Sequence, residues 1–406
     1  MHPTTTTATI LVATLAALAP CATSRAQLPV APDVDAKPRP IELPRFRSRA
    51  PERLAQGVAP TLLVLGLDGT FTTVDGADVP PPPRGFAAAV SREADRLAAP
   101  GIAVLVLADG QRLTGALDVD KGRPIWVSPW VAPRELDLAS VRALVFPGGR
   151  EPEATDEDVI ELRNGDRVTG AVSSVLPDRI VVERGIGDSA ERLEVAMRDV
   201  LSVGIVGGRG ERTGVRAWLQ DGTVIDAPGA EWLGGDHLQF PSIRGAKLPV
   251  ASVPRRLVAA VQSAPGAVLP LAMMAVEASH PAAIPPDRRR ESIAPPSPAD
   301  GTWPLDAPPL DLEGPVMLRF AGTESASNLA CTVARPIAAR AAGSPNLVIR
   351  SGGKEVVRER LGPDRAIVEV RAPLAPGPFE VELSSDDGSI AGCFAVLRRA
   401  LVLPLR

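Results

Sequence analysis

The chain has 406 residues and a formal net charge of −4 at pH 7, with 44 Lys and Arg against 48 Asp and Glu. This balance excludes a globally basic nucleic-acid-binding protein, so we expect no nucleic-acid partner. Only 3% of the residues are aromatic, whereas 43 are Pro and 36 are Gly, and a chain of this length is expected to form several domains rather than one large core.

Residues 1–26 are typical of a signal peptide. An apolar stretch from Ala8 to Ala19 is too short to cross a bilayer as a helix, and the small residues Ser24 and Ala26 occupy positions that suit a signal peptidase. No Lys or Arg precedes this stretch, and an unstructured Thr- and Ala-rich leader is the alternative interpretation. We expect a secreted or periplasmic protein that begins near Gln27.

Two Pro-rich stretches, 27–59 and 284–308, lack any hydrophobic periodicity and are predicted to be linkers. A third stretch, Leu257–Ala278, is apolar, but Pro265, Pro270 and Glu277 interrupt it. It therefore does not predict a membrane-spanning helix, and we expect no transmembrane segment.

A short motif repeats between the two linkers. Asp109-Gly110, Asn164-Gly165 and Asp221-Gly222 each follow an apolar run, and their first residues are 55 and 57 positions apart. A fixed period of this size indicates a tandem module. We name the copies unit 1 (102–150), unit 2 (155–208) and unit 3 (213–263). A degenerate unit with one helix is predicted at 60–101, where Asp68-Gly69 precedes Phe71.

Each unit reads as about five short strands joined by tight turns. Asp-Gly and Asn-Gly pairs supply the positive φ of a two-residue hairpin. Gly115 and Gly170 lie where a strand of a small closed sheet must bend. In unit 2 the predicted strands are Val159–Leu162, Arg167–Val175, Arg179–Glu183, Arg192–Val195 and Val200–Val206. The pattern resembles Sm-like or Src-homology-type small β-barrels.

In the degenerate unit, the residues Phe86, Val90, Ala94 and Leu97 have the spacing of one face of a helix. This spacing predicts a helix over Gly85–Ala98.

The region 309–406 is rich in strands. The predicted strands are Val316–Phe320, Leu347–Arg350, Ala366–Arg371, Phe379–Ser384 and Phe394–Leu403. Hairpin turns are predicted at 351–354, where Gly352 and Gly353 follow a strand, and at 375–378. The predicted fold class is therefore mainly β, with tandem small barrel-like repeats followed by a C-terminal jelly-roll β-sandwich.

Four segments of this region carry a family resemblance: Leu347–Val356, Ile367–Leu374, Phe379–Gly388 and Ala395–Leu403. In this order they resemble the NPCBM-like carbohydrate-binding modules, which form a galactose-binding-like β-sandwich. Members of that family often carry an Asp-His-x-Asp-Trp-like cluster after the acidic Gly turn, whereas this chain has Gly392-Cys-Phe-Ala-Val-Leu397. The resemblance implies ligand binding by loops at one end of the sandwich, and turn placement points to Arg350, Asp386 and Asp387.

The sequence offers little that is typical of catalysis. His237 and His280 each lie apart from any acid–nucleophile pattern, and no nucleotide-binding motif or clustered set of zinc ligands occurs. We therefore expect no catalytic residues, no metal site and no cofactor. The acidic loop that begins at Glu151 is interpreted as solvated charge rather than as a calcium site. The five Trp residues are interpreted as core or cover rather than as sugar platforms.

Cys331 and Cys393 are the two cysteines that remain after removal of the leader. In an oxidising compartment they are candidates for a structural disulfide. The alternative is two buried thiols that act as small hydrophobic residues.

Together these observations favour a secreted or periplasmic, non-catalytic β-protein that binds a glycan or another cell-envelope polymer. A purely structural protein that contacts other proteins is the first alternative, and an unrecognised hydrolase is the second.

Overall fold

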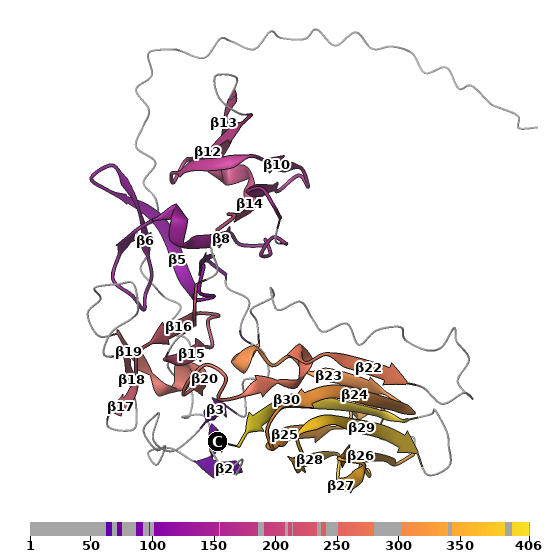
Figure 1. Ribbon diagram of the computed structural model, residues 1–406. Coiled ribbons are helices and arrows are strands. Elements are labelled where there is room, and N and C mark those ends of the chain that lie inside the picture. Colours follow the sequence, from indigo (N-terminus) through magenta and orange to yellow (C-terminus); the bar gives the residue numbers. More distant parts are fainter. Residues whose placement is uncertain are drawn as a thin grey trace, which may run out of the picture. The chain divides into compact units, whose positions relative to one another are not determined.

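The computed structural model describes residues 62–66, 71–74, 87–91, 97, 101–153, 155–185, 191–207, 210–212, 214–233, 237–240, 251–279, 303–339, 343–385 and 392–405 (Figure 1). The chain divides into two parts between Arg47 and Ser48, and all the described residues belong to the second part. The predicted leader and the 27–59 linker lie outside the described residues. No helix in the described part of the chain is long and apolar enough to span a membrane.

The regular secondary structure of the described residues is almost entirely β-strand, as the sequence predicts. The degenerate unit contains β1 (Leu62–Leu65), β2 (Phe71–Val74) and β3 (Ala88–Ser91). Unit 1 contains β4 (Ala103–Leu107), β5 (Arg112–Asp120), β6 (Arg123–Val127), β7 (Arg134–Glu135) and β8 (Val141–Val145). Unit 2 contains β9 (Val159–Leu162), β10 (Arg167–Thr169), β11 (Ala171–Val175), β12 (Arg179–Arg184), β13 (Glu191–Ala196) and β14 (Val200–Gly204). Unit 3 contains β15 (Val215–Leu219), β16 (Val224–Ala227), β17 (Glu231–Leu233), β18 (His237–Phe240), β19 (Ala251–Pro254) and β20 (Val258–Gln262).

A short 3-10 helix precedes the last strand of each numbered unit. These turns are η2 (Leu138–Ser140), η4 (Met197–Asp199) and η5 (Arg255–Leu257). The three units therefore share one order of elements, which agrees with the period seen in the sequence.

The repeats share one continuous sheet rather than each keeping a separate one. Its path is β10-β9-β14-β8-β4-β5-β16-β15-β20-β3-β1-β2, so each copy contributes its last, first and second strands as neighbours. Units 1 and 2 join through their last strands, β8 and β14. Units 1 and 3 join through their second strands, β5 and β16. The degenerate unit keeps the same internal order, β3-β1-β2, which supports its assignment as a copy.

The repeated turn has the same local structure in all three units. Gly110, Gly165 and Gly222 have φ values of 84°, 90° and 88°, in the left-handed region that glycine adopts at low cost. The preceding Asp or Asn side chain accepts a hydrogen bond from the backbone N–H two residues later in every copy, at 3.1, 3.0 and 2.9 Å. The motif is therefore a hairpin turn closed by an Asx contact.

Gly115 and Gly170 mark the point where the second strand changes sheets. β5 pairs with β4 before Gly115 and with β6 after it, whereas in unit 2 the chain breaks into β10 and β11 around Gly170. A Cβ on Gly115 would lie 2.8 Å from Nε1 of Trp126. The second strand therefore changes partners at the two glycines where the sequence predicts a bend, and Gly115 is also required for close packing.

The predicted helix at Gly85–Ala98 is wrong where it is described. Ala88–Ser91 forms the strand β3, which pairs with β1 on one side and β20 on the other, and all four residues are buried. Helical spacing in this short apolar segment was a weak signal, because two neighbouring strands provide partners that the local sequence does not reveal.

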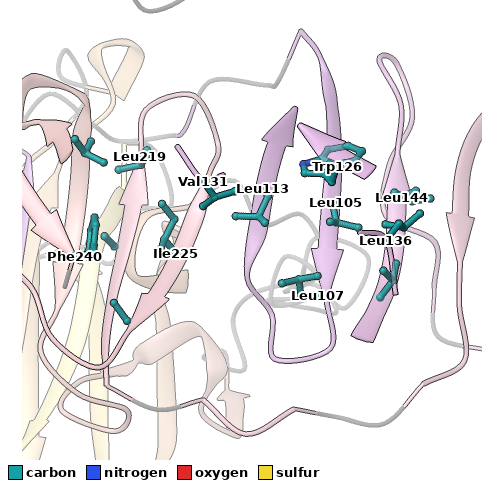
Figure 2. Packing of buried hydrophobic residues seen from close by; sticks show 14 of the residues in the cluster. Leu105, Leu107, Leu113, Trp126, Val131, Leu136, Leu144, Leu219, Ile225 and Phe240 are labelled. Atoms are coloured by element: carbon teal, nitrogen blue, oxygen red, sulfur yellow. The ribbon is translucent and has the colours of Figure 1, made fainter. Parts of the chain in front are cut away.

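A hydrophobic cluster crosses the three units. Leu105, Leu113 and Leu144 contribute from unit 1, and Leu219 and Ile225 contribute from unit 3 (Figure 2). Residues of unit 2 such as Ile160 belong to the same cluster. The units thus share a core as well as a sheet.

The C-terminal region forms two five-stranded sheets, as a sandwich requires. One sheet has the path β21-β30-β25-β28 with β23 beside β30, and the other has the path β22-β24-β29-β26-β27. The strands are β21 (Leu269–Pro270), β22 (Val276–Ser279), β23 (Leu310–Glu313), β24 (Val316–Thr323), β25 (Ser327–Ala334), β26 (Pro345–Ser351), β27 (Lys354–Arg360), β28 (Ile367–Leu374), β29 (Gly377–Ser385) and β30 (Phe394–Pro404). The remaining short turns are η6 (Leu271–Met273), η9 (Pro304–Asp306) and η10 (Ile337–Ala339).

Two details of the sandwich differ from expectation. β21 and β22 lie before the 284–308 linker, so the sandwich draws strands from upstream of residue 309, where we expected it to begin. The 375–378 turn is not a hairpin, because β28 and β29 belong to different sheets. The 351–354 turn is a hairpin between β26 and β27, with positive φ at Gly352 and Gly353.

Candidate functional site

A row of alternating charge crosses all five strands of the β22-β24-β29-β26-β27 sheet. The register places Glu277 opposite Arg319, Arg319 opposite Glu380, Glu380 opposite Arg350, and Arg350 opposite Glu355. We call these five residues the charged row. Because opposite side chains on neighbouring strands lie on the same face of a sheet, the row follows one line across β22, β24, β29, β26 and β27.

Strand alternation explains which face carries the row. Leu318 and Phe320 on β24, and Phe379 and Val381 on β29, are buried in the sandwich core. The rings of Phe320 and Phe379 stack with centroids 5.1 Å apart. Arg319 and Glu380 alternate with these residues along their strands and are directed to the opposite face. The charged row therefore lies on the outer face of a sheet whose inner face packs in the core with Phe320 and Phe379.

Ion pairs surround the row. Arg350 pairs with Glu382, which lies two residues after Glu380 on β29. On β27, Arg358 pairs with Glu355 at 2.6 Å. The hydrogen bond from Arg358 lowers the pKa of Glu355 below its usual value. The side chains of Arg350 and Glu382 are 31% and 28% exposed, so both remain accessible while they hold each other.

This arrangement is suited to hydrogen bonding rather than to stacking. Each guanidinium supplies several N–H donors and each carboxylate supplies only acceptors. A ligand with vicinal hydroxyl groups can satisfy both kinds of group, and bonds to charged partners are the stronger ones. Phe320 and Phe379 are buried, so neither aromatic ring of the core is available as a platform.

Among the three residues suggested by the sequence, Arg350 belongs to the charged row, between Glu380 and Glu355. Asp386 and Asp387 lie outside the described residues. Arg319, Glu380 and Glu277 were not predicted from the sequence. Their period-two alternation with core residues was visible, but the register that aligns them with Arg350 depends on strand neighbours far apart in the chain.

The structure does not form the expected disulfide: Cys331 and Cys393 are both buried thiols. The β25–β30 register places Ala334 opposite Val396, so Cys331 and Cys393 are displaced from each other along the strands by about 20 Å, at roughly 3.3 Å per residue. That separation is far beyond the reach of a disulfide. Burial raises the pKa of the Cys331 thiol to about 12, which keeps it protonated.

A second polar cluster is buried where unit 1 meets unit 3. The hydroxyls of Thr114 and Thr223 lie 2.6 Å apart, and Thr114 Oγ1 donates to Asp221 at 3.1 Å. Across the same junction, the backbone N–H of Asp226 donates to Gln111 Oε1 at 3.1 Å. Residues at matching positions of the two units thus contact each other reciprocally, so the junction has the pattern of a local twofold axis.

An ion pair extends this junction cluster. Arg216 on β15 binds the carboxylate of Asp226 on β16, and its Nη2 also donates to the carbonyl oxygen of Asp109 at 2.9 Å. Burial raises the pKa of Asp226 even though Arg216 acts to lower it. Burial likewise lowers the pKa of the neighbouring Arg212. The pair fastens two units together and is not accessible as a ligand site.

The acidic loop is not simply solvated charge. Glu151 is nearly buried between Arg112 at 2.7 Å and Arg142 at 2.5 Å. Asp158 accepts hydrogen bonds from the backbone N–H groups of Val172 and Val206, at 2.7 and 2.6 Å. At least these two acids therefore fix the strands of units 1 and 2.

The Trp and His residues noted in the sequence do not form a candidate site among the described residues. Trp126 and Trp218 are fully buried, and Trp130 donates from Nε1 to Asp221 at 2.6 Å. His237 is exposed on β18, and His280 lies outside the described residues. Within the described ranges no group of three or more His, Cys, Asp or Glu side chains is placed to hold a metal ion.

Comparison with known families and sequences finds no matching family model and no matching curated protein. Solved structures give distant likenesses. The CBM51 module of Clostridium perfringens GH95 in complex with methyl-galactose is 11% identical, with a TM-score of 0.22 over 23% of this chain and 68% of the module. CBM51-2 of C. perfringens ZmpB in complex with GlcNAc, together with its INT domains, is 8% identical, with a TM-score of 0.22 over 67% of this chain and 45% of that one.

A third likeness is the exo-β-1,3-galactanase of Phanerochaete chrysosporium, at 12% identity and a TM-score of 0.20 over 84% of this chain and 100% of the enzyme. TM-scores this low do not establish a shared fold. The function is therefore argued from the residues of this chain.

Proposed function

We propose that this protein is an exported, non-catalytic β-protein that binds a glycan or another hydroxyl-rich envelope polymer on its C-terminal sandwich. The single observation that supports the proposal is the charged row, which includes Arg350 between Glu380 and Glu355. It offers donors and acceptors in alternation along an accessible sheet face. The repeat units, which we propose to be small barrels, would act as the scaffold that carries the sandwich.

Arg350 is the residue expected to matter most. Arg350 lies opposite Glu380 and Glu355 in the strand register, and its guanidinium is oriented by Glu382. A guanidinium held in this way keeps further N–H groups for a ligand, and a hydrogen bond to a charged group contributes about 1.5–3 kcal/mol. Loss of that bond corresponds to a roughly ten- to hundredfold weaker affinity.

The test is a glycan array on the full chain that includes methyl-galactose and GlcNAc, followed by calorimetry on the glycans that bind. Arg350→Ala is expected to weaken binding by the factor given above. Arg365→Ala is the matched control, because Arg365 is also exposed and also paired, with Glu359 at 3.0 Å, but lies outside the charged row. Failure to bind any glycan, or equal loss in both variants, would contradict the proposal.

A second candidate function is a purely structural scaffold. The observation that favours it is the joining of units by strand edges, with buried polar contacts at the unit 1–unit 3 junction. A protein of this kind would show no glycan affinity, and its sandwich would instead contact a protein.

A further inference from the structure

The second strands of the three units do not all have the same neighbours in the shared sheet. The second strands of units 1 and 3, β5 and β16, pair with each other, whereas the second strand of unit 2, β10, lies at the end of the sheet path and pairs only with β9 among the described strands. The same structural element is therefore used as a junction in two units and is left at an edge in the third.

The sequence of β10 closely matches the strand that forms the internal junction. Unit 1 has Asp-Gly-Gln-Arg-Leu-Thr-Gly over 109–115, and unit 2 has Asn-Gly-Asp-Arg-Val-Thr-Gly over 164–170. Val168 packs against the shared core, as Leu113 does at the matching position. Arg167 and Thr169 alternate with Val168 and therefore face the other way, like Arg112 and Thr114.

The exposure of these matching positions differs sharply. Thr114 is 0% exposed and contacts Asp221 and Thr223 of unit 3. Arg112 is 9% exposed, its backbone pairs with Val224 of β16, and its guanidinium binds Glu151. Arg167 and Thr169 are both exposed, and the side chain of Arg167 is 56% exposed. Unit 2 thus presents to solvent the polar surface that unit 1 buries against unit 3.

The backbone of β10 is also directed for pairing. The carbonyl of Asp166 accepts from Leu162, and the N–H of Gly170 donates to Asp158, so these two residues bond inward. By strand alternation, Arg167 directs its N–H and C=O outward. Arg112 is the corresponding residue of unit 1, and the pairing of Arg112 with Val224 is the backbone bridge of the internal junction.

From this edge we infer that two copies of the protein associate through β10, in an antiparallel pair that repeats the β5–β16 junction. Arg167 would lie opposite Arg167 of the second copy, and Thr169 would contact the Asn164 turn of that copy, as Thr114 contacts Asp221. Each Arg167 is already paired with its own Glu161 at 2.9 Å, which reduces the repulsion between the two guanidinium groups.

The occupant is a second copy, and not an unrelated strand, because the junction is self-complementary. At the unit 1–unit 3 junction, the second-strand hydroxyl of Thr114 contacts the turn residue Asp221 of the other unit. In the reverse direction, Asp226, which occupies the position that matches Thr114, contacts Gln111 of unit 1 through its backbone N–H. Unit 2 carries both parts, Asn164 and Thr169, on one exposed edge. A twofold pair satisfies both parts at once.

Cysteine cross-linking tests this register directly. In a twofold antiparallel pair only the central residue faces itself, with Cα atoms about 5.5 Å apart, a distance that a disulfide spans. With Cys21→Ser as the background, Arg167→Cys is expected to form a disulfide-linked dimer under mild oxidation. Arg192→Cys, on an equally exposed strand of the same unit, is the matched control. The expected ratio of rates is roughly tenfold or more, because pairing raises the effective concentration.

A second measurement does not depend on a new thiol. Arg167→Pro removes only an outward N–H, so the variant should keep the β9 pairing while losing the bridge to the second copy. Sedimentation velocity over a wide range of protein concentration should show a monomer–dimer equilibrium for the wild type and a dissociation constant at least about tenfold higher for the variant. The inference fails if the wild type stays monomeric throughout or forms open chains that Arg167→Pro leaves intact. It also fails if Arg167→Cys and Arg192→Cys cross-link at the same rate.

Discussion

The repeat units and the C-terminal sandwich achieve burial in different ways. β25, β28 and β30 of the sandwich have 8, 8 and 11 residues, and β28 alternates strictly between exposed and buried positions. Strands of the units such as β9 and β10 have 4 and 3 residues, and the junction between units 1 and 3 buries Thr114, Thr223 and Asp226.

The difference shows where specificity lies in each region. The core cluster between the two sandwich sheets is made of apolar side chains, and packing of this kind depends little on the exact partner atoms. The sandwich also buries a few polar side chains, such as Arg335, which donates to backbone carbonyl oxygens. A buried polar junction tolerates only the partner that completes its hydrogen bonds, because each unsatisfied group is costly. Short repeated units need such a device, since their strand edges would otherwise join in more than one order.

The largest predicted effect is on the buried ion pair of the units. Arg216→Ala leaves the carboxylate of Asp226 buried without its guanidinium, which should lower the free energy of unfolding by about 3–5 kcal/mol. Urea unfolding followed by tryptophan fluorescence measures this, because Trp126, Trp130, Trp218 and Trp232 all lie in the units. The double variant Arg216→Ala/Asp226→Ala should cost less than Arg216→Ala, and a larger cost would contradict this account of the junction.

A smaller effect is predicted at the bend of β5. Gly115→Ala places a methyl group against Trp126 and the carbonyl of Val127, and overpacking of this kind costs about 1–3 kcal/mol. Gly101→Ala is the control, since no atom lies within 4 Å of its added Cβ. The same urea experiment should separate the two variants. Equal stabilities would show that the bend is not tightly packed.

The stability of the units should depend on pH in the direction set by the raised pKa of Asp226. Because burial raises the pKa of Asp226 above its usual value of 3.8, the folded state takes up this proton at a higher pH than the unfolded chain does. This group therefore contributes less stability as the pH rises through its folded-state pKa. As the pH rises from about 3.8 to 7, the free energy of unfolding of the wild type should fall relative to that of Asp226→Asn. A parallel pH profile, or a relative gain, would reverse this assignment.

The smallest effect is expected at the exposed ion pair of the sandwich. Arg358→Ala removes a partner of Glu355 on a solvated face, where solvent screening leaves an exposed ion pair with little effect on stability. A thermal scan should therefore show almost no change in Tm. A loss as large as that of Arg216→Ala would erase the contrast between the two regions.

Local signals in the sequence predicted much of this fold. The Asp-Gly and Asn-Gly turns, the bends at Gly115 and Gly170, and the strands of the sandwich all follow from residue preferences or period-two patterns that act over a few positions. The segment Ala88–Ser91 was misread because its strand partners, β1 and β20, lie about 25 and 170 residues away in the chain, and tertiary pairing overrides short-range periodicity.

The candidate site was predicted only in part, for the same physical reason. Turn placement pointed to Arg350, but its neighbours in the row come from four other strands whose register is set by the whole sheet. The structural roles of Glu151 and the absence of a Cys331–Cys393 bond also depend on distances between remote segments.

Hydrogen–deuterium exchange of the full chain, with and without the glycans selected by the array, tests the central claim most directly. We expect added protection in peptides that cover β24, β29 and β26, with no change in the peptides of units 1 to 3. Protection that appears in the units and leaves those three strands unchanged would contradict it.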